Sequence, residues 1–234
     1  MRNGIIICLA FTILSTGCEK AFMEKDPKPK PKAVFKTLWK DIDRKYSFFE
    51  FKKVDWDSVR KVYRPKIHPG MSDRALFDTL AKMLKTLKDG HVNLVSDFDQ
   101  SRYWAWYLDY PQNFDFTLLE RNYLDEDYRI SDDFTIYYRK FDSIGYMYVP
   151  SFGGANPEVL DEVLKTLKNS KGIIVDVRDN GGGRVSLAES LAGRFTDKQR
   201  KYAFYQWKNG PDHDDFTKMI PQYIQPEGDY QYTK

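Results

Sequence analysis

Apolar residues recur at helical spacing in three consecutive segments of the first half of the chain. The first segment begins at Ala33, the second is stopped by Pro65, and the third follows the N-cap residue Ser72 and ends at Gly90. Each segment gathers its apolar side chains on one face, as Val34, Leu38, Ile42 and Tyr46, then Val59, Val62 and Tyr63, then Leu76, Leu80, Met83, Leu84 and Leu87. The pattern predicts a helical N-terminal subdomain over residues 33–95.

The pattern changes to alternating strand and helix after Phe141. Ile144–Val149 and Gly172–Val177 are short apolar runs typical of strands. Between them we expect a helix that is capped by Asn156 and has Pro157 at its first position. A strand–helix–strand unit of this length is a right-handed crossover, so the two strands should be parallel. The second run is apolar throughout, which predicts a central strand covered on both faces. These elements predict an α/β core over residues 143–234.

The intervening residues 96–142 are rich in aromatics and irregular in pattern, which predicts a β-rich connection. The aromatic side chains are expected to pack beneath it, with stacking on a sugar or peptide as the alternative. They are Tyr103, Trp104, Trp106, Tyr107, Tyr110 and Phe114.

A glycine triplet, Gly181, Gly182 and Gly183, joins the last predicted strand to an amphipathic helix. Glycines allow close backbone approach, and the first N–H groups of the helix are unpaired, so the turn is suited to an anion or to an oxyanion that forms in a reaction. Arg184 and Val185 stand where a P-loop needs Lys and Ser or Thr, and Ser186 breaks the dinucleotide fingerprint. A tight connection without a ligand remains the alternative.

The first 18 residues predict a targeting segment. Arg2 precedes an apolar run that is too short to span a membrane, and the small residues before Cys18 resemble the lipobox of bacterial lipoproteins. The alternative is a plain secretory signal. Residues 19–32 alternate Pro with Lys, which predicts an extended tether. We therefore expect lipidation of Cys18 and a lipid anchor in a membrane of the bacterial cell envelope, facing the periplasm or the cell exterior.

Composition excludes several classes of protein. The net charge of +3 is spread over many acids and bases, so no nucleic-acid partner is expected. Cys8 and Cys18 both fall in the targeting segment, which leaves no disulfide in the folded part, and no spacing of His, Cys, Asp and Glu predicts a metal site. No cofactor is expected.

His91 lies at a predicted helix-to-strand junction, where it is either a structural residue or a catalytic base.

Four segments together resemble the tail-specific, or C-terminal-processing, serine peptidases, and among them the branch of the tricorn core and the retinoid-binding-protein-like repeats. They are Leu87–Val92, Ile144–Met147, Ser151–Phe152 and Ile173–Gly183. The resemblance implies an α/β fold with an N-terminal helical subdomain and a crotonase-like, or ClpP-like, α/β domain built from βαβ units. It also implies a peptide or protein substrate.

The resemblance assigns roles to particular residues. His91 matches the family's active-site histidine, and Gly181, Gly182 and Gly183 match the turn that supplies an oxyanion-hole amide. Asp176, Arg178 and Asn180 belong to the most specific block of the resemblance and are expected to support the turn. Gly90 stands where the tricorn branch has a serine that orients the histidine.

The family's nucleophile, a serine in a Ser-Ala-x-Glu-like setting, is expected well after the glycine block, and the sequence to Lys234 has no such setting. Ser151 and Ser186 lack a Gly-x-Ser-x-Gly nucleophile elbow, and Ser186 and Ser190 are expected within the helix that covers the sheet. We therefore expect an incomplete α/β peptidase core that is inactive by itself, from an exported serine peptidase acting through an acyl-enzyme. The alternative is a non-catalytic envelope lipoprotein that binds peptides or another ligand.

Overall fold

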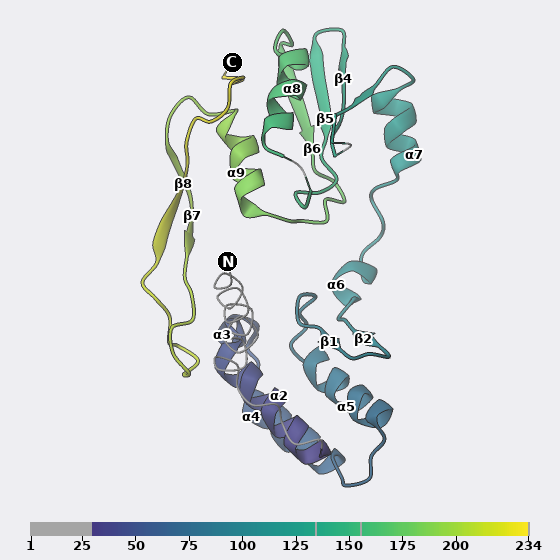
Figure 1. Ribbon diagram of the computed structural model, residues 1–234, viewed down its shortest axis with the longest axis vertical. Helices are drawn as coiled ribbons and strands as arrows, with labels where there is room; N and C mark the ends of the chain where they lie inside the picture. Colours follow the sequence, from purple (N-terminus) through teal and green to yellow (C-terminus); the bar gives the residue numbers. More distant parts are fainter. Residues whose placement is uncertain (1–29, 134, 155, 234) are drawn as a thin grey trace, which may run out of the picture. The chain divides into compact units, whose positions relative to one another are not determined.

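The computed structural model describes residues 30–133, 135–154 and 156–233, and the chain divides into two units (Figure 1). Unit 1 comprises Met1–Asp109 and Lys208–Phe216, and unit 2 comprises Tyr110–Trp207 and Thr217–Lys234. The predicted signal peptide with Cys18 and the predicted tether up to residue 29 lie outside the described residues. Among the residues that the structure does describe, no helix is long and apolar enough to cross a membrane.

Unit 1 is mainly helical. Two tryptophans tie its first helices together, because the indole N–H of Trp39 donates to the Trp56 carbonyl at 3.2 Å and that of Trp56 donates to the Trp39 carbonyl at 3.0 Å. Both side chains are buried in one core with Phe35, Phe49 and the apolar face of the third predicted helix. The elements of this unit are α2 (Pro31–Lys45), α3 (Phe49–Lys52), α4 (Trp56–Tyr63), η1 (Arg64–Lys66), α5 (Asp73–Lys85), β1 (Leu94–Val95), β2 (Gln100–Ser101) and α6 (Ala105–Leu108).

The three predicted helices exist, and their ends differ from the prediction. α2 begins at Pro31, inside the predicted tether, because proline fits the first turn of a helix. Ser72 caps α5 by accepting the Ala75 N–H as predicted, but the helix ends at Lys85 and the left-handed residue beyond it is Lys88 at φ 49°. Gly90 has another role, since a Cβ there would lie 2.4 Å from the Trp106 indole nitrogen.

Unit 2 is built on a mixed sheet with the order β3-β4-β5-β6. β4 pairs with β3 and with β5 antiparallel, and β5 pairs with β6 parallel across the crossover helix α8, as predicted. Met147 on β5 faces a core under α8 and α9, while Tyr146 and Tyr148 face a second core under α7 and η2. The elements are α7 (Phe116–Leu119), η2 (Glu120–Leu124), β3 (Arg129–Ile130), β4 (Tyr137–Phe141), β5 (Ile144–Tyr148), α8 (Glu158–Leu167), β6 (Gly172–Asp176), α9 (Val185–Gly193), β7 (Arg200–Tyr205) and β8 (Ile220–Ile224).

Two expectations for this region are met only in part by the described residues. β6 is the last strand of the sheet within the described residues, and Ile174 is 48% exposed and Val177 47% exposed there, so the expected cover on both faces is not found among these residues. The predicted β-rich connection over residues 96–142 contains the strands β2, β3 and β4, but also the short helices α6, α7 and η2. Of its aromatic residues, Phe114 packs in a core, whereas Trp104, Trp106, Tyr107 and Tyr110 are between 36% and 70% exposed.

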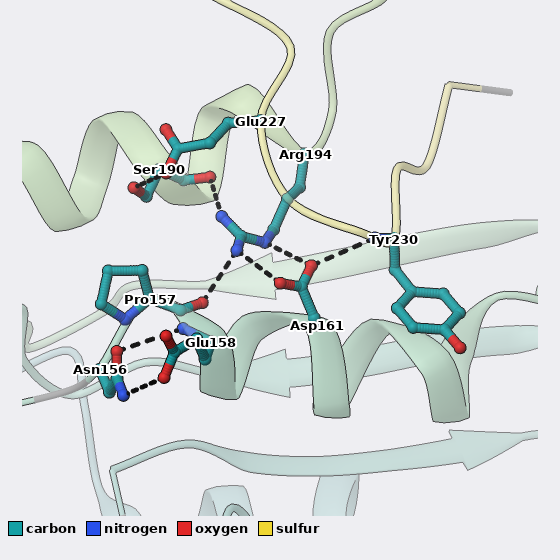
Figure 2. A network of polar contacts seen from close by, with 8 residues as sticks. All are labelled: Asn156, Pro157, Glu158, Asp161, Ser190, Arg194, Glu227 and Tyr230. Carbon is teal, nitrogen blue, oxygen red and sulfur yellow. Dashed lines mark hydrogen bonds and ion pairs between the residues drawn. The ribbon is translucent and has the colours of Figure 1, made fainter.

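The C-terminal segment is held by Arg194, whose guanidinium is buried between α8 and α9 (Figure 2). Its Nε and Nη2 donate to the two carboxylate oxygens of Asp161 at 2.9 and 2.8 Å, and Nη1 donates to the Ser190 carbonyl at 2.9 Å. The Tyr230 N–H donates to the same carboxylate at 3.2 Å, and Ser190 Oγ donates to Glu227 at 2.6 Å. Residues after β8 are thereby fastened to the crossover unit.

Candidate active site

The glycine turn begins where β6 ends and leads directly into α9, as predicted. Gly182 and Gly183 have φ of 83° and 136°, which side chains rarely tolerate. A Cβ on Gly183 would lie 2.2 Å from the Phe152 carbonyl carbon, because Gly183 bridges to the segment that follows β5. Gly181 has neither constraint, since a Cβ there would meet nothing within 4 Å.

The three glycine amides differ in what they are free to bind. The Gly181 N–H donates to the Pro150 carbonyl at 2.9 Å, and the Gly182 N–H donates to Asn180 Oδ1 at 2.8 Å. The Gly183 N–H donates to no group among the residues that the structure describes, and the residue is exposed. Of the three oxyanion-hole candidates, Gly183 therefore has the amide that is available to a ligand.

The polar residues around the turn fix its shape. Asp176 is buried at the end of β6 and accepts from the Arg178 N–H at 2.9 Å, from the Arg178 guanidinium, and from the Tyr146 hydroxyl. Asn180 Nδ2 donates to the Val149 carbonyl at 2.7 Å while its Oδ1 holds the Gly182 amide. The geometry supplies a physical reason for the Asp-x-Arg-x-Asn spacing, because each side chain ties the turn to β5 or β6.

The Asp176 carboxylate is stabilised in its charged form. Partial burial raises its pKa, but the hydrogen bonds from Arg178 and Tyr146 outweigh that effect and hold the pKa below its ordinary value. Burial and the same contact raise the pKa of the Tyr146 hydroxyl. The turn therefore rests on a charged group that stays ionised at neutral pH.

His91 lies in unit 1, just before β1, and the glycine turn lies in unit 2, so each is described by itself. The His91 side chain is 98% exposed, and its Nδ1 is 3.7 Å from Asp89 Oδ1. The same oxygen accepts the His91 backbone N–H at 2.9 Å. His68 lies next to the turn at residues 69–70. His213 lies in a turn, where its Nε2 donates to Asp43 Oδ1 at 3.0 Å and its ring stacks on Phe49.

Asp89 is the functional candidate that the sequence interpretation missed. Its Oδ2 accepts from the buried Tyr46 hydroxyl at 2.8 Å and lies 3.7 Å from Lys52 Nζ. Although partial burial raises its pKa, the hydrogen bonds from His91 and Tyr46 and the Lys52 charge hold the pKa below the ordinary value. A carboxylate two residues before a histidine was the available signal, and it carries meaning only once Tyr46 is seen to fix the carboxylate in place.

The three serines near the site are not arranged as nucleophiles. Ser151 Oγ donates to the Gly182 carbonyl at 3.2 Å and accepts from the Gly153 N–H, so it supports the turn. Ser190 is buried in α9 and donates to Glu227, and Ser186 lies exposed in the first turn of the same helix. Within the described ranges, no group of three or more His, Cys, Asp or Glu residues is placed to hold a metal ion.

Comparisons with known proteins give two family matches. Residues 27–85 match the model of the tricorn protease C1 domain, which covers the helices up to α5. Residues 143–227 match the model of peptidase family S41, which covers the sheet strands β5 and β6, the glycine turn and the β7–β8 hairpin. A search of curated proteins gave no match.

A crystal structure from Parabacteroides merdae, provisionally described as a peptidase, is similar to this chain with 41% identity and a TM-score of 0.80. The similarity covers 88% of this chain, which spans 65% of the length of that structure. The similarity to the photosystem II D1 C-terminal processing protease covers 88% of this chain and 73% of the length of that protein, with 12% identity and a TM-score of 0.45. The similarity to a lipoprotein from Streptococcus agalactiae covers 85% of this chain and 60% of the length of that lipoprotein, with 13% identity and a TM-score of 0.41.

Three of the four motif segments lie within the match to peptidase family S41, whereas Leu87–Val92, with His91, lies between the two matched ranges. The Parabacteroides merdae structure shares the fold over most of the chain. These findings support a relationship to the tail-specific proteases, in which residues 143–227 match peptidase family S41 and residues 27–85 match the tricorn protease C1 domain.

Proposed function

We propose that this chain supplies the base and the oxyanion donor of a serine peptidase that cleaves peptide bonds through an acyl-enzyme. The observation that carries the proposal is the Gly183 amide, which donates to no group among the described residues and is held at a φ that glycine alone adopts readily, inside the segment that matches family S41. A fixed amide of this kind stabilises the tetrahedral oxyanion because it needs no reorganisation as the charge develops, an effect of about 3–4 kcal/mol.

His91 is the proposed general base, and Asp89 its positioning residue. In this role His91 Nε2 takes the proton from the attacking serine hydroxyl and returns it to the leaving amine. Because the ring is 98% exposed, it can turn to close the 3.7 Å separation from Asp89 into a hydrogen bond on Nδ1. Tyr46 and Lys52 keep Asp89 in place and charged, which compensates for the serine that Gly90 replaces.

The nucleophile is proposed to come from residues encoded after Lys234, since no serine described near the site has a suitable setting. By the same proposal, the present chain forms no acyl-enzyme and retains at most peptide binding. Export and lipidation at Cys18 belong to this proposal too, because they rest on the lipobox-like sequence alone.

The roles of His91 and Asp89 are tested by steady-state peptide hydrolysis with the full-length gene product. We expect His91→Ala to lower kcat about 10²-fold to 10⁴-fold, the range for a lost general base. Asp89→Asn should lower kcat less, because it removes the positioning carboxylate and leaves the base itself in place. His68→Ala is the matched control and should leave kcat unchanged. Equal turnover in His91→Ala and His68→Ala would remove His91 from the mechanism.

A non-catalytic lipoprotein that binds peptides in the same region is the second candidate, favoured by the absence of a placed nucleophile among the described serines. The coding sequence after Lys234 separates the two. A strand leading into Ser-Ala-x-Glu supports the peptidase, and a stop codon there supports the binding protein.

A further inference from the structure

A cavity in unit 1 combines positive charge with an apolar floor. Its volume is about 670 Å³, and Phe35 and Ile67 are the buried residues that line it. The remaining lining residues are Lys32, Lys36, Arg60, Arg64, Pro65 and His68. They come from the start of α2, the end of α4, and η1 with the turn after it. A volume of this size suits a small ligand or a lipid headgroup with part of its apolar body.

The charge of this cavity is unbalanced. Four of its lining residues are cations, and no Asp or Glu lines it within the part of the chain that the structure describes. None of the four has a carboxylate within ion-pair distance among the described residues; the Arg60 guanidinium instead lies 4.4 Å from the centroid of the Trp39 ring. The buried ring holds Arg60 in place while leaving its N–H groups available. A ligand with negative charge and an adjoining apolar part is complementary to this arrangement.

We propose that this cavity binds the phosphate-bearing headgroup of an anionic membrane lipid. Lys32 follows Cys18 by few enough residues that an extended tether of about 3 Å per residue keeps the cavity within roughly 40 Å of the membrane. This distance argument rests on the proposed lipid anchor, whereas the complementarity of charge and apolar floor does not. Anionic lipids attract basic segments near a membrane at about 1 kcal/mol per Lys or Arg, so four cations make a substantial contribution.

The test is isothermal titration of the whole chain with water-soluble, short-chain lipids, using Cys18→Ser protein so that lipidation plays no part. Dihexanoyl phosphatidylglycerol should bind, dihexanoyl phosphatidylcholine should bind at least about tenfold more weakly, and affinity should fall as salt is added. Lys36→Gln and Arg64→Gln should each lower the affinity about fivefold. Lys61→Gln is the matched control, because Lys61 is exposed on α4 beside Arg60 and does not line the cavity.

Several outcomes would overturn the proposal. They are equal affinity for the two lipids, no loss of affinity in Lys36→Gln and Arg64→Gln, or the same loss in Lys61→Gln. Inorganic phosphate binding as tightly as the anionic lipid would show that the apolar floor of Phe35 and Ile67 is not used. An acidic peptide binding more tightly than the lipid would assign the cavity to a protein partner. Because no arm measures peptide hydrolysis, the result is independent of the proposed peptidase activity.

Discussion

At the scale of single residues, the glycine turn is defined by differences among neighbouring glycines. Gly183 combines a φ of 136° with contact to the backbone of Phe152, and its amide is the one that stays available. Gly181 adopts no restricted φ and has open space around its Cα. The triplet in the sequence therefore holds one position that only glycine can fill for reasons of strain and packing together.

This difference predicts a large loss of stability in one alanine variant and almost none in the other. Gly183→Ala should lower the free energy of unfolding by about 3 kcal/mol, because it adds backbone strain and an overlap with Phe152. Gly181→Ala should change it by less than about 0.5 kcal/mol, as expected for an unhindered surface position. Urea unfolding followed by circular dichroism measures both. A similar loss in the two variants would contradict the described turn.

Because of Asp176, the stability of unit 2 should fall as the pH becomes acidic. Its folded pKa is lowered, so its contribution is present above the unfolded value near about 4 and is lost as pH falls through the folded pKa. Asp176→Asn should cost about 1–3 kcal/mol at neutral pH through weakened bonds to Arg178 and Tyr146, and should flatten the acid limb of stability against pH.

The control for this pH dependence is Asp179→Asn. Asp179 is exposed with φ of 56°, a conformation that Asn accepts as readily as Asp. Its thermal unfolding profile between about pH 2 and pH 7 should follow the unsubstituted chain. An unchanged acid limb in Asp176→Asn would mean that other carboxylates control acid unfolding.

At the scale of elements, the sequence predicted what depends on local spacing. The prediction of the inner face of α8 was correct for every buried residue, because apolar positions three and four apart share one face of a helix. The buried residues are Val159, Leu160, Val163, Leu164 and Leu167. The parallel pairing of β5 and β6 also followed, because a short crossover permits one arrangement.

What the sequence could not supply depends on distant contacts. The apolar run of β6 predicted a strand but not its neighbours, because the pairing with β5 depends on residues far away in the sequence. Asp89 gains its role from Tyr46, which lies 43 positions earlier in the chain. Gly90 was expected to stop α5, whereas the packing of Trp106 is what requires a small residue there.

The junction of α8, α9 and the C-terminal segment predicts a strong dependence on Arg194. Arg194→Met would leave the Asp161 carboxylate without its cation and the Pro157 and Ser190 carbonyls without a donor, at a cost of about 3 kcal/mol or more in unfolding free energy. Arg200→Met removes an exposed ion pair with Asp197 and should cost less than about 1 kcal/mol. Chemical denaturation compares them, and equal losses would contradict the buried network of Figure 2.

At the scale of the whole molecule, the residues of the proposed chemistry are divided between the two units. The base and its positioning carboxylate belong to unit 1, and the oxyanion donor belongs to unit 2. The chain covers 65% of the length of the similar Parabacteroides merdae structure. The proposal therefore requires that a complete enzyme brings these groups together with a serine that the present residues do not provide.

The most direct test is covalent labelling of the full-length gene product with a fluorophosphonate probe, read by mass spectrometry of the intact protein and its peptides. The account predicts one probe per chain on a serine after Lys234, labelling slowed about 10²-fold or more by His91→Ala, and no labelling of residues 1–234 alone. A full-length protein that takes up no probe, or takes it up on Ser151, Ser186 or Ser190, would contradict it.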